Sequence, residues 1–532
     1  MTQKRDGSIY CKMLGSLMPQ PSWLLTAFLV LFLCMGFFFW GIFADDAYIV
    51  ARYAHNFNVG YGMVFNAGER VNALTSPLHF AIFVLLGIIT NNIVEVYEAI
   101  MLVVVALTLL WASKVGFQKK GKRALFLALT MLSPFLTFWT VGGLETPLLL
   151  VLLTVVIVRL HQEDGTPAND HGKTLIILCG LIFLTRYDSI LFVGPIAAYI
   201  LYSRRRLLGI QVVSTCMALL IAAWLGFSLY YFGDLLPTSY YTKSPLKQDS
   251  TSILKGSLYL LNFLLLSLVF LLFITRRSQA SISLQQSIRR AVYVGLSLFL
   301  TYGVLAGIKH MMYAYRLFVP YLPVLVFILM RRGGGRKLTQ NPNQSAFVIS
   351  IILAFQFILA AIIYYESQNP NLSLLWKKQD LINAYYEFST AGARTTKLAT
   401  NIYRENAHEI KQHWTSQALV RDRPPRVFIL PGGLMPYSYP EAYIYETLVS
   451  YRHQCQYMLF ESADYLQLIY PAINEKYPAQ TLKADAYKWE KISSHTFWAT
   501  GYASPMAINV DVFYQRNPLV NRLPQKINQA CL

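Results

Sequence analysis

Long apolar runs separated by short polar segments fill most of the first 365 residues of the chain. A helix that crosses a bilayer needs about 20 apolar residues. Runs near that length predict helices at 23–43, 94–115, 123–141, 146–160, 174–186, 189–203, 208–232, 254–275, 291–308, 316–330 and 345–364. The first run is longer than a signal-peptide core and no small-residue cleavage site follows it, so we expect a retained anchor. The pattern predicts a polytopic α-helical membrane protein with about 11 transmembrane helices.

The composition indicates a membrane protein, and the positions of its basic residues predict its orientation in the membrane. Hydrophobic residues make up 55% of the chain and charged residues only 14%, which is a membrane profile. The formal charge of +19 does not indicate nucleic-acid binding, because the basic residues form short clusters between apolar runs. With a cytoplasmic N-terminus, all clusters fall on the cytoplasmic side, as the positive-inside rule requires. They are Lys4/Arg5/Lys12, Lys114/Lys119/Lys120/Lys122/Arg123, Arg159/Lys173, Arg204/Arg205/Arg206, Arg276/Arg277/Arg289/Arg290 and Arg331/Arg332/Arg336/Lys337.

One apolar segment, "PLHFAIFVLLGIIT" at 77–90, is too short for this scheme. Counting it as a span would put the cluster at 119–123 outside, against the charge rule. We therefore expect an interfacial or re-entrant helix on the outer face. Residues 44–93 then form one external loop that carries amphipathic helices.

From about residue 366 the composition becomes mixed polar and aromatic, with strand-like runs such as "RVFIL" and "AINVDVFYQR". We expect a transmembrane domain at 1–365 and an extracytoplasmic α/β domain at 366–532. Cys455 and Cys531 lie in this second domain, where a disulfide and two free thiols are equally compatible with the sequence. The six cysteines lack CxxC spacing, so a cysteine metal site is not expected.

Two adjacent carboxylates, Asp45 and Asp46, follow the first apolar run in "GIFADDAYIVARYAHN". The segment has helical periodicity, and Asp45 and Arg52 share one face of the predicted helix. An aspartate there is a favoured N-cap, but capping does not need a second carboxylate. The pair suits a general base whose neighbour binds a substrate hydroxyl or a metal ion.

Further polar residues are predicted at the same outer level. They are Asn66, Glu69, Arg70, Thr75, Glu145, Arg186, Asp188, Asp234, Lys243, Lys309, His310 and Arg316. Each has a structural alternative: Glu145 can cap a helix, Arg186 can pair with Asp188, Lys243 can snorkel, His310 can be structural and Arg316 can anchor at the interface. Taken together they predict a charged cavity that opens outward, because ionisable residues near membrane depth line cavities or pair. Arginine and lysine would hold the phosphate of a lipid-linked donor, and carboxylates would handle hydroxyls and the proton.

These segments resemble the GT-C class of glycosyltransferases, which use polyprenyl-phosphate sugars. The resemblance is nearest to mycobacterial-type terminal arabinofuranosyltransferases. It rests on "DDAYIVARYAHNFNVGYGMVFNAGERVNALTSPL", "GGLETPL", "TRYDS", "LLPTSYYTK" and "YRLFVPYLP". The sequence departs from that family at Ala73, where a glycine or similar small residue is usual, and at "RYDS", where the motif is "RPDG"-like.

The resemblance implies a GT-C-like fold and a role for each site residue. Asp45 would be the general base, and Asp46 would orient the acceptor or a cation. Arg52 would hold the helix or the phosphate. The sugar-donor site would include Arg52, Glu145, Arg186, Asp188, Lys243, His310 and Arg316, and the acceptor loop Asn66, Glu69 and Thr75. Metal use stays open, with Asp45 and Asp46 as candidate ligands of Mg, Mn or Ca.

The sequence therefore predicts an inverting glycosyltransferase in the inner (plasma) membrane. It would move a sugar, most simply arabinofuranose, from a polyprenyl monophosphate to an extracytoplasmic glycan or glycoprotein. The alternatives are transfer of an aminosugar to lipid A or of mannose to protein, a flippase or transporter for lipid-linked sugars, and a membrane scaffold. A transporter fits less well, because transporters place polar groups near mid-membrane.

Overall fold

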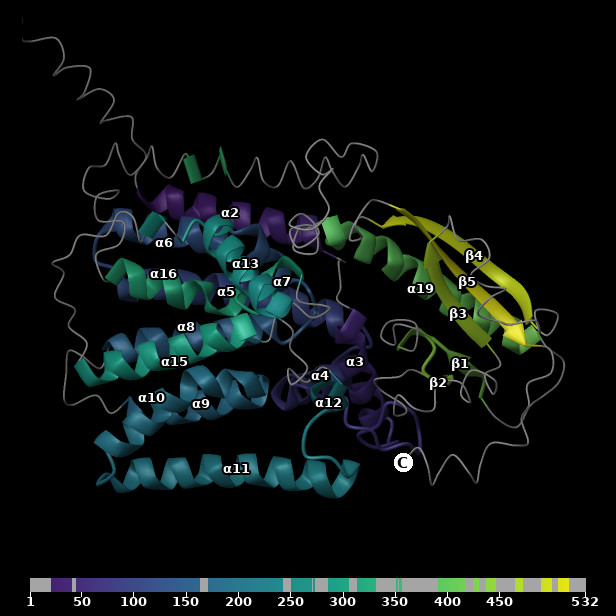
Figure 1. The fold of residues 1–532 in the computed structure, drawn as a ribbon, viewed down its shortest axis with the longest axis horizontal. Helices are drawn as coiled ribbons and strands as arrows, with labels where there is room; N and C mark the ends of the chain where they lie inside the picture. Colours follow the sequence, from purple (N-terminus) through teal and green to yellow (C-terminus); the bar gives the residue numbers. More distant parts are fainter. Residues whose placement is uncertain are drawn as a thin grey trace, which may run out of the picture.

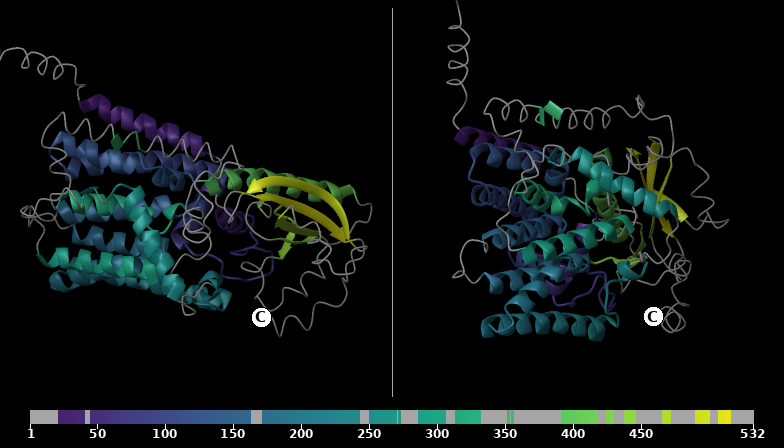
Figure 2. Two further views of the ribbon diagram at one scale, coloured as in Figure 1. Left: turned by 45° about the horizontal axis from the view of Figure 1, so that its top comes forward. Right: turned by 60° about the vertical axis from the view of Figure 1, so that its left-hand side comes forward.

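A bundle of roughly parallel helices forms one part of the molecule, and a mixed sheet with one long helix forms the other (Figure 1). The computed structural model describes residues 21–40, 45–162, 171–242, 250–269, 271–272, 286–305, 313–331, 351–352, 354–355, 391–416, 424–429, 437–445, 465–471, 489–499 and 506–515. Short helices and loops from the segment after α2 lie between the two parts. Two further views show the same arrangement (Figure 2).

Helices occupy most of the apolar runs predicted from the sequence. They are α2 (Pro21–Phe39), α5 (Ile93–Gly116), α8 (Thr146–Gln162), α9 (Gly172–Thr185), α10 (Ile190–Ser203), α11 (Leu208–Phe232), α13 (Ser250–Leu266), α15 (Gln286–Leu305) and α16 (Leu322–Arg331). Within the described ranges, three helical segments, Ile93–Gly116, Leu208–Phe232 and Ile288–Leu305, are long and apolar enough to cross a membrane. Most of 345–364 lies outside those ranges, so the full number of spans stays a prediction.

The run at 123–141 is two helices rather than the single one predicted. α6 (Lys120–Met131) and α7 (Pro134–Thr140) meet at an angle of 62°. The cause is Pro134, which has no N–H to donate and disfavours helical geometry at the preceding residue, Ser133. If this bent pair counts as one span, the described residues hold up to four.

The predicted helix at 316–330 also begins late. Two 3-10 turns, η3 (Tyr313–Tyr315) and η4 (Val319–Tyr321), precede α16, which starts at Leu322. Ala314 and Tyr315 have left-handed backbone torsions, with φ of 47° and 57°, and a right-handed helix cannot run through them. Arg316 therefore lies in a break between helices.

The loop after α2 holds α3 (Asp45–Asn58) and α4 (Pro77–Ile89), both at predicted helical positions. The Ser76 hydroxyl caps α4 by accepting a hydrogen bond from the His79 backbone N–H, and Pro77 takes the first turn, where its missing N–H costs nothing. α3, α4 and the short α12 (Thr238–Thr242) lie together at one end of the bundle (Figure 1). That end faces the C-terminal sheet.

The C-terminal part contains α19 (Ala391–Ser416) and a five-stranded mixed sheet with the order β2-β1-β3-β5-β4. Its strands are β1 (Arg426–Phe428), β2 (Tyr443–Tyr445), β3 (Tyr465–Pro471), β4 (Trp489–Ala499) and β5 (Met506–Gln515). β1 pairs in parallel with β2 and β3, whereas β5 pairs antiparallel with β3 and β4. Both strand-like runs singled out in the sequence contribute, as β1 and β5.

Contacts join this C-terminal part to α3 and α5. Arg404 of α19 donates to the Glu95 carboxylate at 2.9 Å and to the Tyr48 hydroxyl at 3.2 Å. The Tyr437 ring packs on Tyr48, with centroids 5.3 Å apart. The helix that begins at the aspartate pair is therefore held from the C-terminal side as well as by the bundle.

Candidate functional site

Four charged side chains predicted as sugar-donor residues form one network. Arg316 Nη2 lies 3.1 Å and 3.3 Å from the two oxygens of Glu145. Arg186 Nη1 lies 3.1 Å from the same Glu145, and Arg186 also binds both oxygens of Asp188, at 3.0 and 2.6 Å. Glu145 is thus shared by two arginines, and Asp188 occupies the outer face of Arg186.

Breaks between helices supply each member of the network. Glu145 immediately precedes α8, Arg186 lies between α9 and the 3-10 turn η2 (Tyr187–Ser189), and Arg316 lies between η3 and η4. These positions release the side chains from helical packing and direct them to one another. The tertiary fold, rather than any local motif, brings together residues up to 171 positions apart.

Asp46 lies next to this network. It stands in the first turn of α3, its side chain is 30% exposed, and its Oδ2 is 3.9 Å from Arg316 Nη1. The side chain of Asp45 is outside the described residues, so its position relative to Asp46 and Arg52 stays a prediction. The structure does place the start of α3, which contains both aspartates, beside Arg316.

Not all the N–H donors of Arg316 have a hydrogen-bond partner among the described residues. Its Nε is buried and has no hydrogen-bond partner in the described part of the chain, and its Nη1 has only the long contact to Asp46. Arg186 differs, since Nε, Nη1 and Nη2 all bind carboxylates. A buried unpaired donor costs free energy, and a phosphate oxygen is the kind of acceptor that arginine binds best. Arg316 therefore has donors that an anionic ligand can bind.

Glu145 stays ionised in this setting. Burial would raise the pKa of its carboxyl, but the positive charges of Arg316 and Arg186 outweigh burial and lower that pKa to about 2. A carboxylate with a lowered pKa that two arginines already bind is a weak general base near neutral pH. It can hold the two guanidinium groups in place.

Arg52 belongs to a second cluster. It is 2% exposed, and its guanidinium donates to the backbone oxygens of Phe65 and Ala442, both at 2.7 Å, and to Asn66 Oδ1 at 3.3 Å. Asn66 in turn donates to Glu69 at 2.9 Å. These bonds connect α3, its following loop and the C-terminal part. They correspond to the helix-holding role of Arg52, and a role in phosphate binding stays untested.

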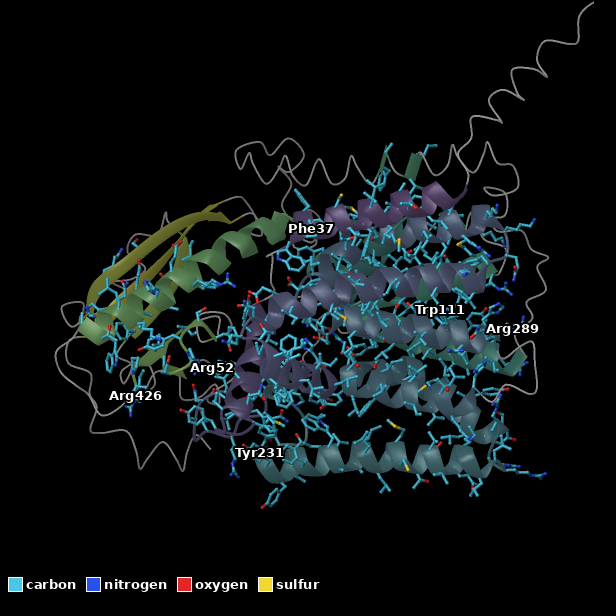
Figure 3. All side chains as sticks on the ribbon, turned by 180° about the vertical axis from the view of Figure 1, so that it is seen from behind. Phe37, Arg52, Trp111, Tyr231, Arg289 and Arg426 are labelled. Atoms are coloured by element: carbon cyan, nitrogen blue, oxygen red, sulfur yellow. The ribbon has the colours of Figure 1, made fainter. Side chains whose placement is uncertain are left out.

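Thr75 is exposed on the loop before α4. Lys243 and His310 lie outside the described residues. Figure 3 shows Arg52 and Tyr231 at the end of the bundle nearest Arg426 of the C-terminal part, whereas Trp111 and Arg289 lie at the far end.

Three buried residues at the site were missed by sequence reasoning. Trp139 of α7 lies against Arg316, with the guanidinium carbon 5.5 Å from the ring centroid. Neither ring nitrogen of His79 and neither carboxylate oxygen of Glu98 has a hydrogen-bond partner among the described residues. Glu98 could have been noticed in the sequence, because it is an acidic residue inside an apolar run. Trp139 and His79 look like ordinary core residues in the sequence.

A divalent cation at Asp45 and Asp46 stays a prediction, because the side chain of Asp45 lies outside the described residues. No group of three or more His, Cys, Asp or Glu side chains that could hold a metal occurs in the ranges the structure describes. The charged partner of Asp46 there is Arg316, and a cation would be repelled by that guanidinium.

No protein-family model matches the sequence, and no curated protein matches it. The chain is similar to two solved structures of ArnT from Cupriavidus metallidurans. The one bound to undecaprenyl phosphate has a TM-score of 0.49 at 11% identity, covering 92% of this chain and 98% of that one. The apo structure has a TM-score of 0.46 at 9% identity, covering 91% and 98%. At these low values the likeness assigns no function, and the proposal below rests on the residues of this chain.

Proposed function

We propose that the chain is an inverting glycosyltransferase that takes a sugar from a polyprenyl monophosphate. The observation that carries the proposal is Arg316, which is buried and bound to Glu145. Its Nε has no hydrogen-bond partner among the described residues, and its Nη1 lies 3.9 Å from Asp46. This is an anion-binding group beside a carboxylate at the start of a helix. Such a combination suits phosphate recognition next to acid–base chemistry.

Arg316 binds the phosphate of the sugar donor through Nε and Nη1 in this proposal. Glu145 holds the guanidinium of Arg316 through Nη2, and Arg186, which is itself bound to Asp188, holds Glu145. Because the supporting groups are already paired before the ligand arrives, little reorganisation is needed on binding. The phosphate oxygen replaces the long contact between Arg316 and Asp46.

Transfer is a direct displacement. The acceptor hydroxyl oxygen attacks the anomeric carbon from the face opposite the phosphate, the bond from that carbon to the phosphate oxygen breaks, and the configuration inverts. The hydroxyl proton passes to the carboxylate of Asp45, and polyprenyl monophosphate leaves with the bonding electrons. Asp46 orients the acceptor. Since phosphate is already a good leaving group, positioning and base catalysis can suffice.

Arabinofuranose, or another pentose, is the sugar we propose, with an extracytoplasmic glycan or glycoprotein as acceptor and the inner membrane as location. The support is the resemblance of the long "DDAYIVARYAHNFNVGYGMVFNAGERVNALTSPL" block and of "GGLETPL" to terminal arabinofuranosyltransferases. The apolar helices support the lipid bilayer as partner. An aminosugar transferred to lipid A, or mannose to protein, stays an alternative on the same site.

A transfer assay with defined donors tests the proposal. Purified full-length protein in nanodiscs is incubated with radiolabelled decaprenyl-phosphate arabinofuranose, an aminoarabinose analogue and a mannose analogue, each with an arabinan oligosaccharide, lipid A and an acceptor peptide. We expect label to move from the arabinofuranose donor to the oligosaccharide, and Arg316→Gln to abolish it. Transfer from another donor would change the proposed sugar. If no donor supports transfer, the proposal that the chain is a glycosyltransferase is wrong.

A lipid-linked sugar flippase is the second candidate function. The network favours the enzyme, because its members lie at helix ends on the side of α3, whereas transporters place their polar groups near mid-membrane. In a deletion strain, loss of a transferase should leave the lipid-linked sugar on the outer leaflet. Accumulation on the cytoplasmic leaflet would favour the flippase.

A further inference from the structure

The backbone that carries Arg316 is held in an unfavourable conformation. Ala314 (φ 47°, ψ 35°) and Tyr315 (φ 57°) are consecutive left-handed residues, and neither is glycine. Each costs free energy that surrounding contacts must offset, and such residues cluster where a side chain has to be aimed. In this chain the side chain that follows is Arg316.

Trp139 contacts both the left-handed turn and the arginine. Its indole N–H donates to the backbone oxygen of Ala314 at 2.9 Å, and its ring lies 5.5 Å from the guanidinium carbon of Arg316. Trp139 is 1% exposed and comes from α7, the short helix created by the break at Pro134. One side chain therefore holds the backbone before Arg316 and the face of its guanidinium group.

The same helix contributes a second contact to the turn. Phe135 of α7 packs edge-on against Tyr315, with ring centroids 4.8 Å apart. α7 thus presents two aromatic side chains, one turn apart, to residues 314–316. Both rings follow the 62° bend between α6 and α7, so the bend sets the direction in which α7 presents them.

We propose that Trp139 is a positioning residue that sets the orientation of Arg316 for the phosphate of the lipid donor. The inference rests on the proposed function, in which Arg316 binds that phosphate. The indole N–H holds the left-handed turn through the Ala314 oxygen. The ring face restricts the orientation of the Arg316 guanidinium, so that Nε and Nη1 stay available for the phosphate. A residue that only filled the core would need the ring but not the N–H.

Trp139→Phe separates these two roles, because phenylalanine keeps an aromatic ring and removes the hydrogen bond to Ala314. Trp111→Phe is the matched control. Trp111 also lies under an arginine, with Arg159 at 5.7 Å, but it is at the far end of the bundle (Figure 3). The measured quantity is the dissociation constant of undecaprenyl monophosphate, obtained by native mass spectrometry of the full-length protein in detergent.

We expect Trp139→Phe to raise this constant about tenfold, the usual scale for a lost buried hydrogen bond, and Trp111→Phe to leave it within twofold, about the scatter expected for a distant site. Arg316→Gln should also weaken binding, and the double variant Trp139→Phe/Arg316→Gln should bind no more weakly than Arg316→Gln alone. This non-additivity is the signature of a residue that acts through Arg316.

Each failure has a separate meaning. If Arg316→Gln binds normally, the phosphate assignment in the proposed function fails. If Arg316→Gln binds weakly but Trp139→Phe binds normally, or the two effects multiply, the positioning role of Trp139 is overturned. Melting temperatures of all variants are measured alongside, and a general loss of stability in Trp139→Phe with unchanged binding would also overturn it.

Discussion

Arg316 and Glu145, 171 positions apart in the sequence, meet through both carboxylate oxygens, at 3.1 and 3.3 Å. The contact closes the bundle at the end that carries α3, since it ties the break before η4 to the start of α8. It also leaves the remaining nitrogens of Arg316 directed away from Glu145. The pair is thus both a structural tie and the base on which the proposed phosphate site stands.

Replacing Glu145 by alanine should destabilise the protein strongly. The buried Arg316 and the partly buried Arg186 would lose a shared counter-charge, and breaking a buried ion pair costs about 3 to 5 kcal/mol. We expect a clear fall in the melting temperature in detergent without any ligand. Thr75→Ala, at an exposed position, is the control and should melt like the wild type. An unchanged melting temperature in Glu145→Ala would contradict the structural role of the network.

The contribution of Glu145 should vanish in acid. Its folded pKa, about 2, lies below the ordinary value of 4.5, so the carboxylate stabilises the folded state above pH 4.5 and this stabilisation is lost as the pH falls toward 2. We expect wild type and Glu145→Gln to differ most above pH 5 or so and to converge as the pH approaches about 2. Melting temperatures between pH 3 and 7, roughly, measure the trend. A gap that widens in acid would contradict it.

Arg52 should matter for stability rather than for phosphate binding. Arg52→Ala removes hydrogen bonds to Phe65, Asn66 and Ala442. The Phe65 oxygen keeps its hydrogen bond from Asn56, but any buried acceptor left without a partner costs about 1 to 3 kcal/mol. We expect a lower melting temperature but an unchanged dissociation constant for undecaprenyl monophosphate at a temperature where the variant is folded.

Arg404→Ala is the matched comparison for Arg52. It removes another arginine contact between the same two parts of the molecule, but Arg404 is 46% exposed and its partner Glu95 27% exposed. Exposed ion pairs contribute about 0 to 1 kcal/mol, so we expect Arg404→Ala to melt close to the wild type. Weak phosphate binding in a folded Arg52→Ala would return Arg52 to the sugar-donor site.

The helices could be predicted from the sequence, because a helix that packs in a core and a helix that faces lipid both need apolar side chains. The predicted range 208–232 coincides with α11, and the helix expected to start at the aspartates is α3. Breaks were less readable. The bend at Pro134 could have been expected from proline chemistry, whereas the left-handed residues 314 and 315 are an alanine and a tyrosine, which carry no turn signal.

The residues of the network and the pairing of Arg186 with Asp188 could be predicted from the sequence, whereas the sharing of Glu145 by two arginines could not. Charge orientation placed Glu145, Arg186, Asp188 and Arg316 at one level, and the structure joins them in one network. Nothing local distinguishes Arg316 from Arg52, since both are single arginines near helices. Only the tertiary packing shows the difference. Arg52 donates hydrogen bonds to backbone oxygens, whereas Arg316 keeps a buried Nε without a partner among the described residues.

Asparagine at each of the two aspartates should separate the base from its supporting neighbour. Asp45→Asn removes the proton acceptor, and general-base catalysis contributes about 10²- to 10⁴-fold, so transfer should fall to that extent. Asp46→Asn keeps a hydrogen-bonding group beside Arg316 and should reduce transfer by about tenfold.

The two variants share a readout that isolates chemistry from binding. Because Arg316, not the aspartates, binds the phosphate in the proposed site, both variants should keep the wild-type dissociation constant for undecaprenyl monophosphate and the wild-type melting temperature. If Asp46→Asn were the variant that abolished transfer while Asp45→Asn stayed active, the base would be Asp46, the aspartate whose side chain the structure places against the arginine.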